Sequence, residues 1–194
     1  LLLSNVERLI RIHKNIGQLQ VLYAGKAHPS DKIGQKLIQD IVNTGKKYRQ
    51  DIKILFLEGY DLDLGKLMTS GVDVWLNTPL PPNEASGTSG MKAAHNGIPH
   101  FSTLDGWWLE GHIENETGWA IGGERPAGEA AELAKGDAEE LYKKLEEKIV
   151  PLYYKNKETW KDIMRNAIAI NASFFNTHRM VQHYVQEAYF YHED

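Results

Sequence analysis

The feature that most constrains the fold is the alternation of strand-like and helix-like patterns over the first two-thirds of the chain. Short apolar runs are separated by segments whose apolar residues recur at helical spacing. Such alternation predicts an α/β fold, with a doubly wound and mostly parallel sheet covered by helices on both faces. The run 52–57 is almost continuously apolar, which is typical of a strand buried on both faces. The predicted strands are 18–24, 52–57, 72–76, 100–104 and 119–121.

The remaining segments predict helices. Ser4 is a candidate N-cap for the first helix, and Ser30 or Asp31 for the second. Gly97 predicts the end of a short helix that follows a Gly-rich turn. From residue 137 onward the pattern is helical only, and 122–136 is expected to be a surface loop. We therefore predict a Rossmann-like part over 1–122, followed by C-terminal helices over 123–194 that pack on it.

Composition excludes several classes of function. The 22 Lys and Arg against 26 Asp and Glu give a net charge of −4, which argues against a nucleic-acid partner bound through its phosphate backbone. The absence of cysteine excludes disulfides and Cys-zinc sites, and it fits a reducing compartment such as the cytoplasm, the predicted location. No apolar run approaches the ~20 residues of a membrane helix. The eight histidines form no metal-binding motif, so no metal is expected.

One segment carries chemistry: residues 83–92, which read N-E-A-S-G-T-S-G-M-K. The segment follows a predicted strand and opens a predicted helix. Its small residues Ser86, Gly87, Ser89 and Gly90 allow the backbone to approach a ligand, and the first N–H groups of the helix would attract an anion. The spacing matches neither a P-loop nor G-x-G-x-x-G, and it is not a nucleophile elbow.

Lys92 lies within the first turn or so of the same predicted helix. A partly desolvated lysine beside a positive helix end has its ammonium form disfavoured, and such an amine can react with a carbonyl. An anion site beside a reactive lysine fits pyridoxal 5'-phosphate, which carries both a phosphate and an aldehyde. A Gly-rich turn that binds no ligand is the alternative interpretation, because such turns are common in doubly wound folds.

Residues 84–92 (EASGTSGMK) resemble the pyridoxal-phosphate attachment signature of the glycogen and α-glucan phosphorylases. Other segments are similar to this family in the same order along the chain, and several of them look like its short archaeal and bacterial branch. The supporting segments are 25–29 (GKAHP), 55–60 (LFLEGY), 104–111 (LDGWWLEG), 118–122 (GWAIG) and 175–184 (FNTHRMVQHY). The resemblance therefore extends over most of the chain.

The resemblance implies a set of cofactor contacts. Lys92 matches the lysine that holds the cofactor covalently. Thr88 and Ser89 match positions whose backbone N–H groups bind the cofactor phosphate. Tyr60 matches a tyrosine near the cofactor.

The resemblance also implies a substrate and a reaction. Glu84, Ser86 and Gly87 match positions that hold hydroxyl groups of the glucosyl unit. The implied enzyme is a glycosyltransferase that splits α-1,4-glucan ends with orthophosphate, giving α-D-glucose 1-phosphate with retained configuration. The implied fold is the C-terminal domain of the two-domain GT-B architecture, with strand order 3-2-1-4-5-6.

The chain departs from the family pattern at its beginning. In the family, a strand and a Lys-Arg loop precede the helix that residues 1–16 resemble. We therefore expect a C-terminal portion that lacks phosphorolysis by itself and whose partner is the N-terminal domain of the same enzyme. A missing central strand would leave unpaired edges that favour association, and a homo-oligomer is one form of it.

Two other functions stay open. A nucleotide-sugar transferase of the same architecture would carry a second glutamate where this chain has Lys92, and an amine cannot accept hydrogen bonds from a ribose. A non-catalytic carbohydrate-binding module is the second alternative. Asp105 and Glu110 suggest a glycosidase pair, but a tight turn at Asp105-Gly106 with Trp107 and Trp108 packed nearby is the favoured interpretation.

Overall fold

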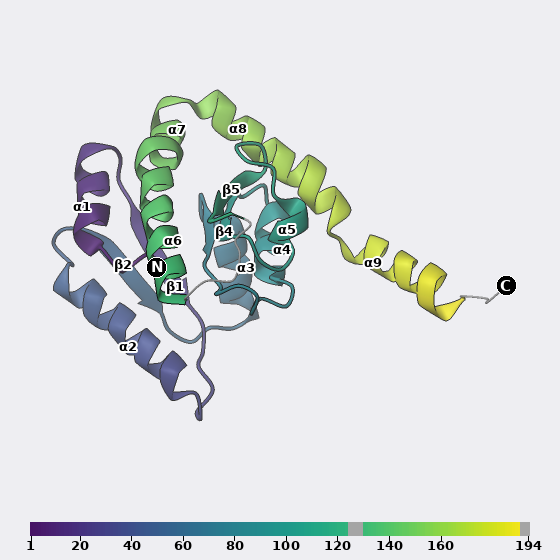
Figure 1. The fold of residues 1–194 in the computed structure, drawn as a ribbon, viewed down its shortest axis with the longest axis horizontal. Helices are drawn as coiled ribbons and strands as arrows, with labels where there is room; N and C mark the ends of the chain where they lie inside the picture. Colours follow the sequence, from purple (N-terminus) through teal and green to yellow (C-terminus); the bar gives the residue numbers. More distant parts are fainter. Residues whose placement is uncertain (124–129, 191–194) are drawn as a thin grey trace. The chain divides into compact units, whose positions relative to one another are not determined.

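A computed structural model describes residues 1–123 and 130–190, except for the side chains of 130–133. The chain is a mixed α/β protein in which every described strand pair is parallel (Figure 1). The residues divide into two compact units, which we describe separately. The first holds residues up to 68 and again from 130 to 157, and the second holds 69–123 and 158–190. The domain ranges 1–122 and 123–194 stay a prediction.

The first unit contains a two-stranded parallel sheet. Strand β1 pairs with β2, with Gln20 opposite Lys53 and Ala24 opposite Leu57. Helix α1 begins after Asn5, whose side chain accepts a hydrogen bond from the backbone N–H of Arg8 at 3.0 Å. The predicted cap Ser4 is therefore wrong by one residue. The elements of this unit are α1 (Val6–Asn15), β1 (Gln20–Ala24), α2 (Lys32–Lys47), β2 (Lys53–Leu57), α6 (Ala130–Lys144), the π-helical segment η1 (Leu145–Ile149) and α7 (Val150–Lys155).

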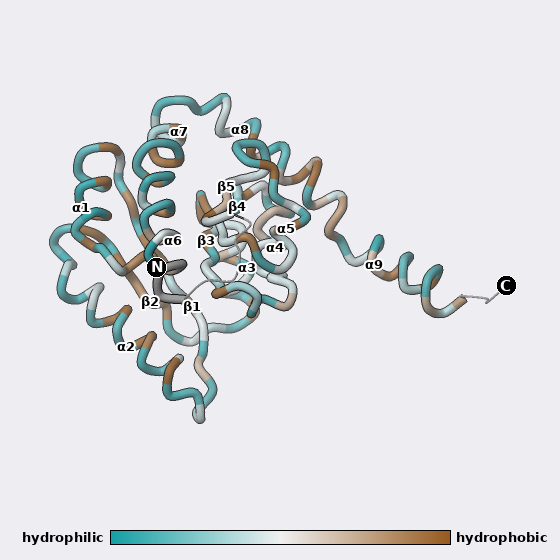
Figure 2. Tube along the Cα trace, in the orientation of Figure 1, coloured by the Kyte–Doolittle hydropathy of each residue, from teal (hydrophilic) through white to brown (hydrophobic). Residues whose placement is uncertain are grey.

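Burial in the first unit follows strand alternation. Ile54 of β2 is buried, whereas Lys53 and Leu55 on the opposite face are exposed. The prediction that this strand is buried on both faces is therefore wrong, although its apolar character is plain in Figure 2. Tyr142 of α6 binds the segment that precedes α1. Its hydroxyl donates to the Leu2 carbonyl at 2.5 Å and accepts from the Asn5 backbone N–H at 2.9 Å.

The second unit contains a three-stranded parallel sheet in the order β3-β4-β5. All residues of β4 and β5 are buried, as expected of parallel strands covered on both sides. Helix α3 (Leu62–Gly71) leads into this unit from the first. The other elements are β3 (Trp75–Asn77), α4 (Thr88–His95), β4 (His100–Thr103), α5 (Trp108–Gly111), β5 (Gly118–Ile121), α8 (Lys157–Asn166), η2 (Ala167–Ala172), α9 (Thr177–Tyr184) and η3 (Val185–Tyr189).

The described strands form two sheets, where the sequence predicts one. Within each sheet the neighbours follow the predicted order, since β1 lies beside β2, and β4 lies between β3 and β5. Parallel strands that alternate with helices are compatible with a Rossmann-like fold. The strand order 3-2-1-4-5-6 stays a prediction.

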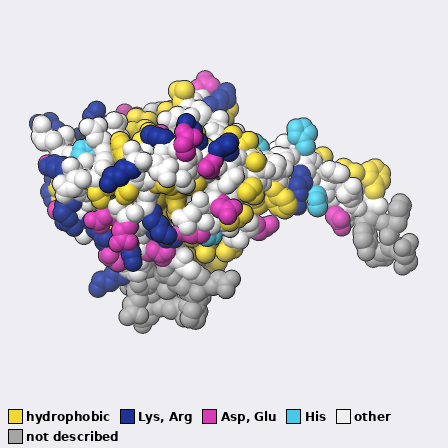
Figure 3. All heavy atoms as spheres, turned by 90° about the horizontal axis from the view of Figure 1, so that it is seen from above, with side chains coloured by type: hydrophobic (Ala, Val, Ile, Leu, Met, Phe, Trp, Pro, Cys, Tyr) yellow, Lys and Arg dark blue, Asp and Glu magenta, His cyan; other side chains and the backbone are white. Residues whose placement is uncertain are grey.

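The C-terminal helices begin earlier than expected. Helix α6 starts at Ala130 and runs through Gly136, so the predicted loop 122–136 is wrong over 130–136, while residues 124–129 lie outside the described part. Asn176 caps α9 by accepting a hydrogen bond from the Arg179 backbone N–H at 2.9 Å. No helix of the described residues has the length and apolar character needed to cross a membrane. Acidic and basic side chains are interspersed on the face shown in Figure 3.

Candidate functional site

The predicted anion site lies at the start of α4, in the second unit. Gly87 is the N-cap residue and has φ 86° and ψ 42°, a left-handed conformation that glycine adopts without a Cβ clash. No side chain caps this helix. The first N–H groups of a helix have no acceptor within it, so the amides of Thr88 and Ser89 are available to an anion.

Lys92 lies one helical turn after Thr88, so the two side chains share a face of α4. Both residues are exposed. The buried face of the helix is formed by Gly90, Ala93 and Ala94 instead. The prediction that Lys92 is partly desolvated is therefore not met by the described residues, and among them none is a partner of its amine. The amine is open to a ligand.

A turn from β4 to α5 holds the loop before α4 through two hydrogen bonds. The Asp105 carboxylate accepts from the Glu84 backbone N–H at 2.9 Å, and the Trp107 backbone N–H donates to the Ser86 carbonyl at 2.8 Å. The other Asp105 oxygen accepts from the Gly106 backbone N–H at 2.9 Å. Asp105 is buried. The predicted turn at Asp105 is confirmed, and its carboxylate oxygens are engaged with the backbone.

Two glycines of the motif lie directly against aromatic side chains. A Cβ at position 87 would come within 2.9 Å of Trp107 Cδ1, and one at position 90 would come within 2.8 Å of Trp107 Nε1 and 2.6 Å of His100 Cε1. These separations are shorter than ordinary van der Waals contact. The motif therefore needs small residues for close packing, in addition to the backbone conformation at Gly87.

His100 and Trp107 are buried polar side chains. Burial lowers the pKa of His100 to about 3, so its imidazole is neutral at physiological pH. Both imidazole nitrogens and Trp107 Nε1 are buried without a hydrogen-bond partner among the described residues. The two rings lie 5.1 Å apart between centroids. A buried donor without a partner costs about 1–3 kcal/mol, so the local packing must compensate for it.

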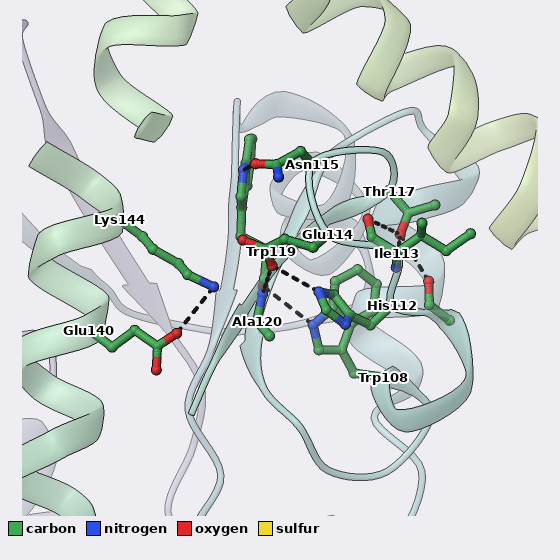
Figure 4. A network of polar contacts seen from close by, with 11 residues as sticks. Trp108, His112, Ile113, Glu114, Asn115, Thr117, Trp119, Ala120, Glu140 and Lys144 are labelled. Atoms are coloured by element: carbon green, nitrogen blue, oxygen red, sulfur yellow. Dashed lines mark hydrogen bonds and ion pairs between the residues drawn. The ribbon is translucent and has the colours of Figure 1, made fainter. Parts of the chain in front are cut away.

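Behind this cluster, a hydrogen-bonded loop fixes Trp108 (Figure 4). Trp108 Nε1 donates to the Trp119 carbonyl at 3.3 Å. Glu114 accepts from the Ala120 backbone N–H at 3.0 Å and lies 2.9 Å from His112 Nε2. Trp108 and Trp119 are fully buried. These hydrogen bonds therefore join α5, where Trp108 lies, to β5.

The far end of α4 is also fixed within the second unit. Gly97 follows the helix with φ 72°, which confirms it as the predicted stop. His95 is exposed, and its Nε2 lies 3.0 Å from the Phe175 carbonyl. Met91 and Phe175 pack against the Trp107–Trp108 core. The helix that carries Lys92 is thus fixed at both ends.

Most of the predicted site residues lie on one continuous loop and helix. Tyr60 lies in the first unit, where it follows β2 and is 39% exposed. The residues that share the loop and helix are Glu84, Ser86, Gly87, Thr88, Ser89 and Lys92.

No group of three or more His, Asp or Glu side chains that could hold a metal occurs in the part of the chain the structure describes.

Sequence reasoning did not find the contacts that support this loop. The contacts of Glu84 with Asp105 and of Gly90 with His100 join segments far apart in the chain. Local patterns carry no signal for them. The sequence predicts only the tight turn at Asp105, with Trp107 and Trp108 packed nearby.

Comparison with known proteins identifies the family of the chain. A family model described as "Carbohydrate phosphorylase" matches residues 3–119. Over 97% of the chain, the identity is 43% to the glycogen phosphorylase of Aquifex aeolicus and 40% to the maltodextrin phosphorylase of Thermococcus litoralis. The chain spans 28% and 23% of the lengths of these two relatives. It is also 38% identical, over 88% of its length, to the glycogen phosphorylase of Mycobacterium tuberculosis, of which it covers 20%. The chain belongs to the carbohydrate phosphorylase family.

Proposed function

We propose that this chain is the cofactor- and sugar-binding part of the C-terminal domain of an α-glucan phosphorylase with the GT-B architecture. The reaction is the phosphorolysis of α-1,4-glucan ends by orthophosphate, which yields α-D-glucose 1-phosphate with retained configuration. The observation that carries the proposal is the uncapped start of α4 with the open amine of Lys92 one turn further on. Family membership and the names of the relatives support it.

The residues present fit pyridoxal 5'-phosphate. Backbone amides of Thr88 and Ser89 at a helix N-terminus suit a phosphate, and the exposed Lys92 amine suits an aldehyde. Tyr60 is proposed to lie near the same cofactor. When bound, the cofactor supplies a phosphate group whose second pKa is about 6, suitable for proton transfer near neutral pH.

The sugar is proposed to bind on the loop before α4. The ionised carboxylate of Glu84 can accept hydrogen bonds from glucosyl hydroxyls, and the Ser86 hydroxyl can both donate and accept them. Ser86 is exposed, and Glu84 is partly exposed. The backbone of Gly87 is proposed to contact the same glucosyl unit. Asp105 holds the Glu84 amide, so the Glu84 backbone is fixed before a sugar arrives.

The chain covers about a quarter of its first two relatives, so we propose that the rest of the site comes from elsewhere in the enzyme. Basic residues that bind orthophosphate would belong to that part, as would the N-terminal domain that faces the sugar. The purified 194-residue chain is then expected to form no glucose 1-phosphate from glycogen and orthophosphate. Measurable phosphorolysis by it would contradict this division of the site.

The central test maps the modified lysine. The protein is incubated with pyridoxal 5'-phosphate, reduced with borohydride and digested, and the labelled peptide is identified by mass spectrometry. We expect label on Lys92 at the lowest cofactor concentrations and its loss in Lys92→Ala. Lys161→Ala is the matched control, because Lys161 is an exposed lysine of the same unit paired with Glu158 at 2.8 Å. Label spread evenly over surface lysines would refute the assignment.

A further inference from the structure

Both glycines of the proposed anion-binding turn lie against the indole ring of Trp107. Cβ atoms at positions 87 and 90 would each come within 2.9 Å or less of Trp107 ring atoms. These two glycines flank Thr88 and Ser89. Trp107 therefore packs against the turn on both sides of the peptide units whose N–H groups would bind the proposed phosphate.

Trp107 is itself held from several directions. Its backbone N–H donates to the Ser86 carbonyl, and its ring makes an edge contact with Phe175 at 5.2 Å between centroids. The centroid of the His100 ring lies 5.1 Å from that of Trp107, and the same ring packs against Gly90. The indole is 4% exposed and His100 is 1% exposed. The ring therefore cannot shift without disturbing the turn.

The polar atoms of this pair are unexpected in a core. Trp107 Nε1 and both nitrogens of His100 are buried without partners among the described residues. An apolar pair of similar volume would avoid the cost of removing these polar groups from water. Unsatisfied buried groups call for an explanation, and strained or costly arrangements concentrate at functional sites.

We propose that Trp107, supported by His100, is a positioning residue of the phosphate site, which fixes the orientation of the Thr88 and Ser89 amides. The inference rests on the proposed function, since it assigns the turn to a phosphate. Fixed donors need no reorganisation when the anion binds, and small misplacements of such groups are costly. Trp107 touches neither cofactor nor substrate in this proposal.

The test uses Trp107→Ala and Trp107→Phe in the intact protein as its gene encodes it. Hydrogen exchange of the peptide covering 84–92 is measured without cofactor, and the affinity for pyridoxal 5'-phosphate is measured separately. We expect Trp107→Ala to speed exchange and to weaken affinity by about tenfold or more relative to wild type. Trp107→Phe keeps an aromatic ring and should stay within about threefold of wild type in both measurements. Trp160→Ala is the matched control, because Trp160 is also 4% exposed in the second unit but packs against Trp119 instead of residues 84–92. It should leave both readouts at their wild-type values.

The outcomes separate the two proposals. If Trp107→Ala keeps wild-type exchange and affinity, the positioning role is overturned. If wild-type protein binds no cofactor but Trp107→Ala still loosens residues 84–92, the proposed function fails while the support of the turn stands. If Trp107→Ala does not fold, Gly90→Ala replaces it, since its methyl group would displace the same rings. Unchanged exchange in a folded Gly90→Ala protein would equally overturn the inference.

Discussion

The Asp105 carboxylate accepts a hydrogen bond from the backbone N–H of Glu84 at 2.9 Å, so a buried acid orders the loop that precedes the proposed anion-binding turn. The other carboxylate oxygen bonds the Gly106 backbone N–H. One side chain thereby joins the turn after β4 to the loop before α4.

Replacing Asp105 with asparagine should destabilise the second unit. An amide keeps one acceptor oxygen but places an NH₂ donor against a backbone N–H, which leaves one buried amide unsatisfied. We expect a loss of about 1–3 kcal/mol in the free energy of unfolding, measured by urea denaturation. Asp63→Asn is the control, because Asp63 forms only an exposed ion pair with Lys66, and its change should stay within about 0.5 kcal/mol. Equal effects of the two substitutions would refute the role of Asp105.

Gly87→Ala should be costly for two reasons. A left-handed conformation costs a residue with a Cβ about 1–2 kcal/mol, and the new methyl group would meet Trp107 Cδ1 at 2.9 Å. The expected loss in unfolding free energy is about 2 kcal/mol or more, with weaker phosphate binding. Gly71→Ala is the comparison, since a Cβ there meets nothing within 4 Å. A Gly87→Ala protein as stable as Gly71→Ala would contradict the strain argument.

His100 predicts a pH dependence of stability. Its pKa is lowered to about 3 by burial, whereas the unfolded chain titrates near the ordinary value of about 6.5. Between these values the unfolded state binds more protons, so stability is complete above about pH 6.5 and falls as the pH drops toward 3. The slope from this residue reaches about 1.4 kcal/mol per pH unit.

Substituting His100→Leu tests this linkage. The variant should lose that contribution to the slope between pH 6.5 and 4, whatever its effect on absolute stability. Denaturation curves at several pH values measure both proteins. Parallel pH profiles for wild type and variant would show that His100 is not the group responsible.

Tyr142→Phe should loosen the N-terminal segment of the first unit. Its hydroxyl bonds both the Leu2 carbonyl and the Asn5 backbone N–H, and the latter residue caps α1. We expect a loss of about 1–2 kcal/mol together with faster hydrogen exchange over residues 1–9. Tyr48→Phe, which removes an exposed hydroxyl bonded to Glu7, should have a much smaller effect. Unchanged exchange over 1–9 in Tyr142→Phe would contradict the prediction.

Much of the fold could be predicted because strands and helices leave local periodic signals. The five strands occur where the apolar runs indicated, and their parallel pairing follows from the helices between them. The family followed from the run at 84–92, and the comparisons confirm it. Gly97 ends its helix as predicted, and Asp31, one of the two predicted N-caps, caps α2, because cap residues act on their own neighbours.

The errors concern properties that depend on distant partners. Leu55 is exposed together with Leu22, its partner on β1, and Lys92 is exposed because α4 turns its small residues inward. The π-helical segments were not predicted, since one extra residue in a turn barely changes the apolar period. The support of the motif by Trp107 and His100 could not be read from the motif itself.

The close approach of Gly90 to Trp107 couples two positions that lie on different elements. A side chain at 90 and an indole at 107 compete for the same space, so neither position can change size alone. Over evolution, lineages that place a larger residue at position 90 should carry a small one at 107, and lineages with a tryptophan at 107 should keep glycine at 90. An alignment of carbohydrate phosphorylases should therefore show these two positions varying together, with their combined volume nearly constant.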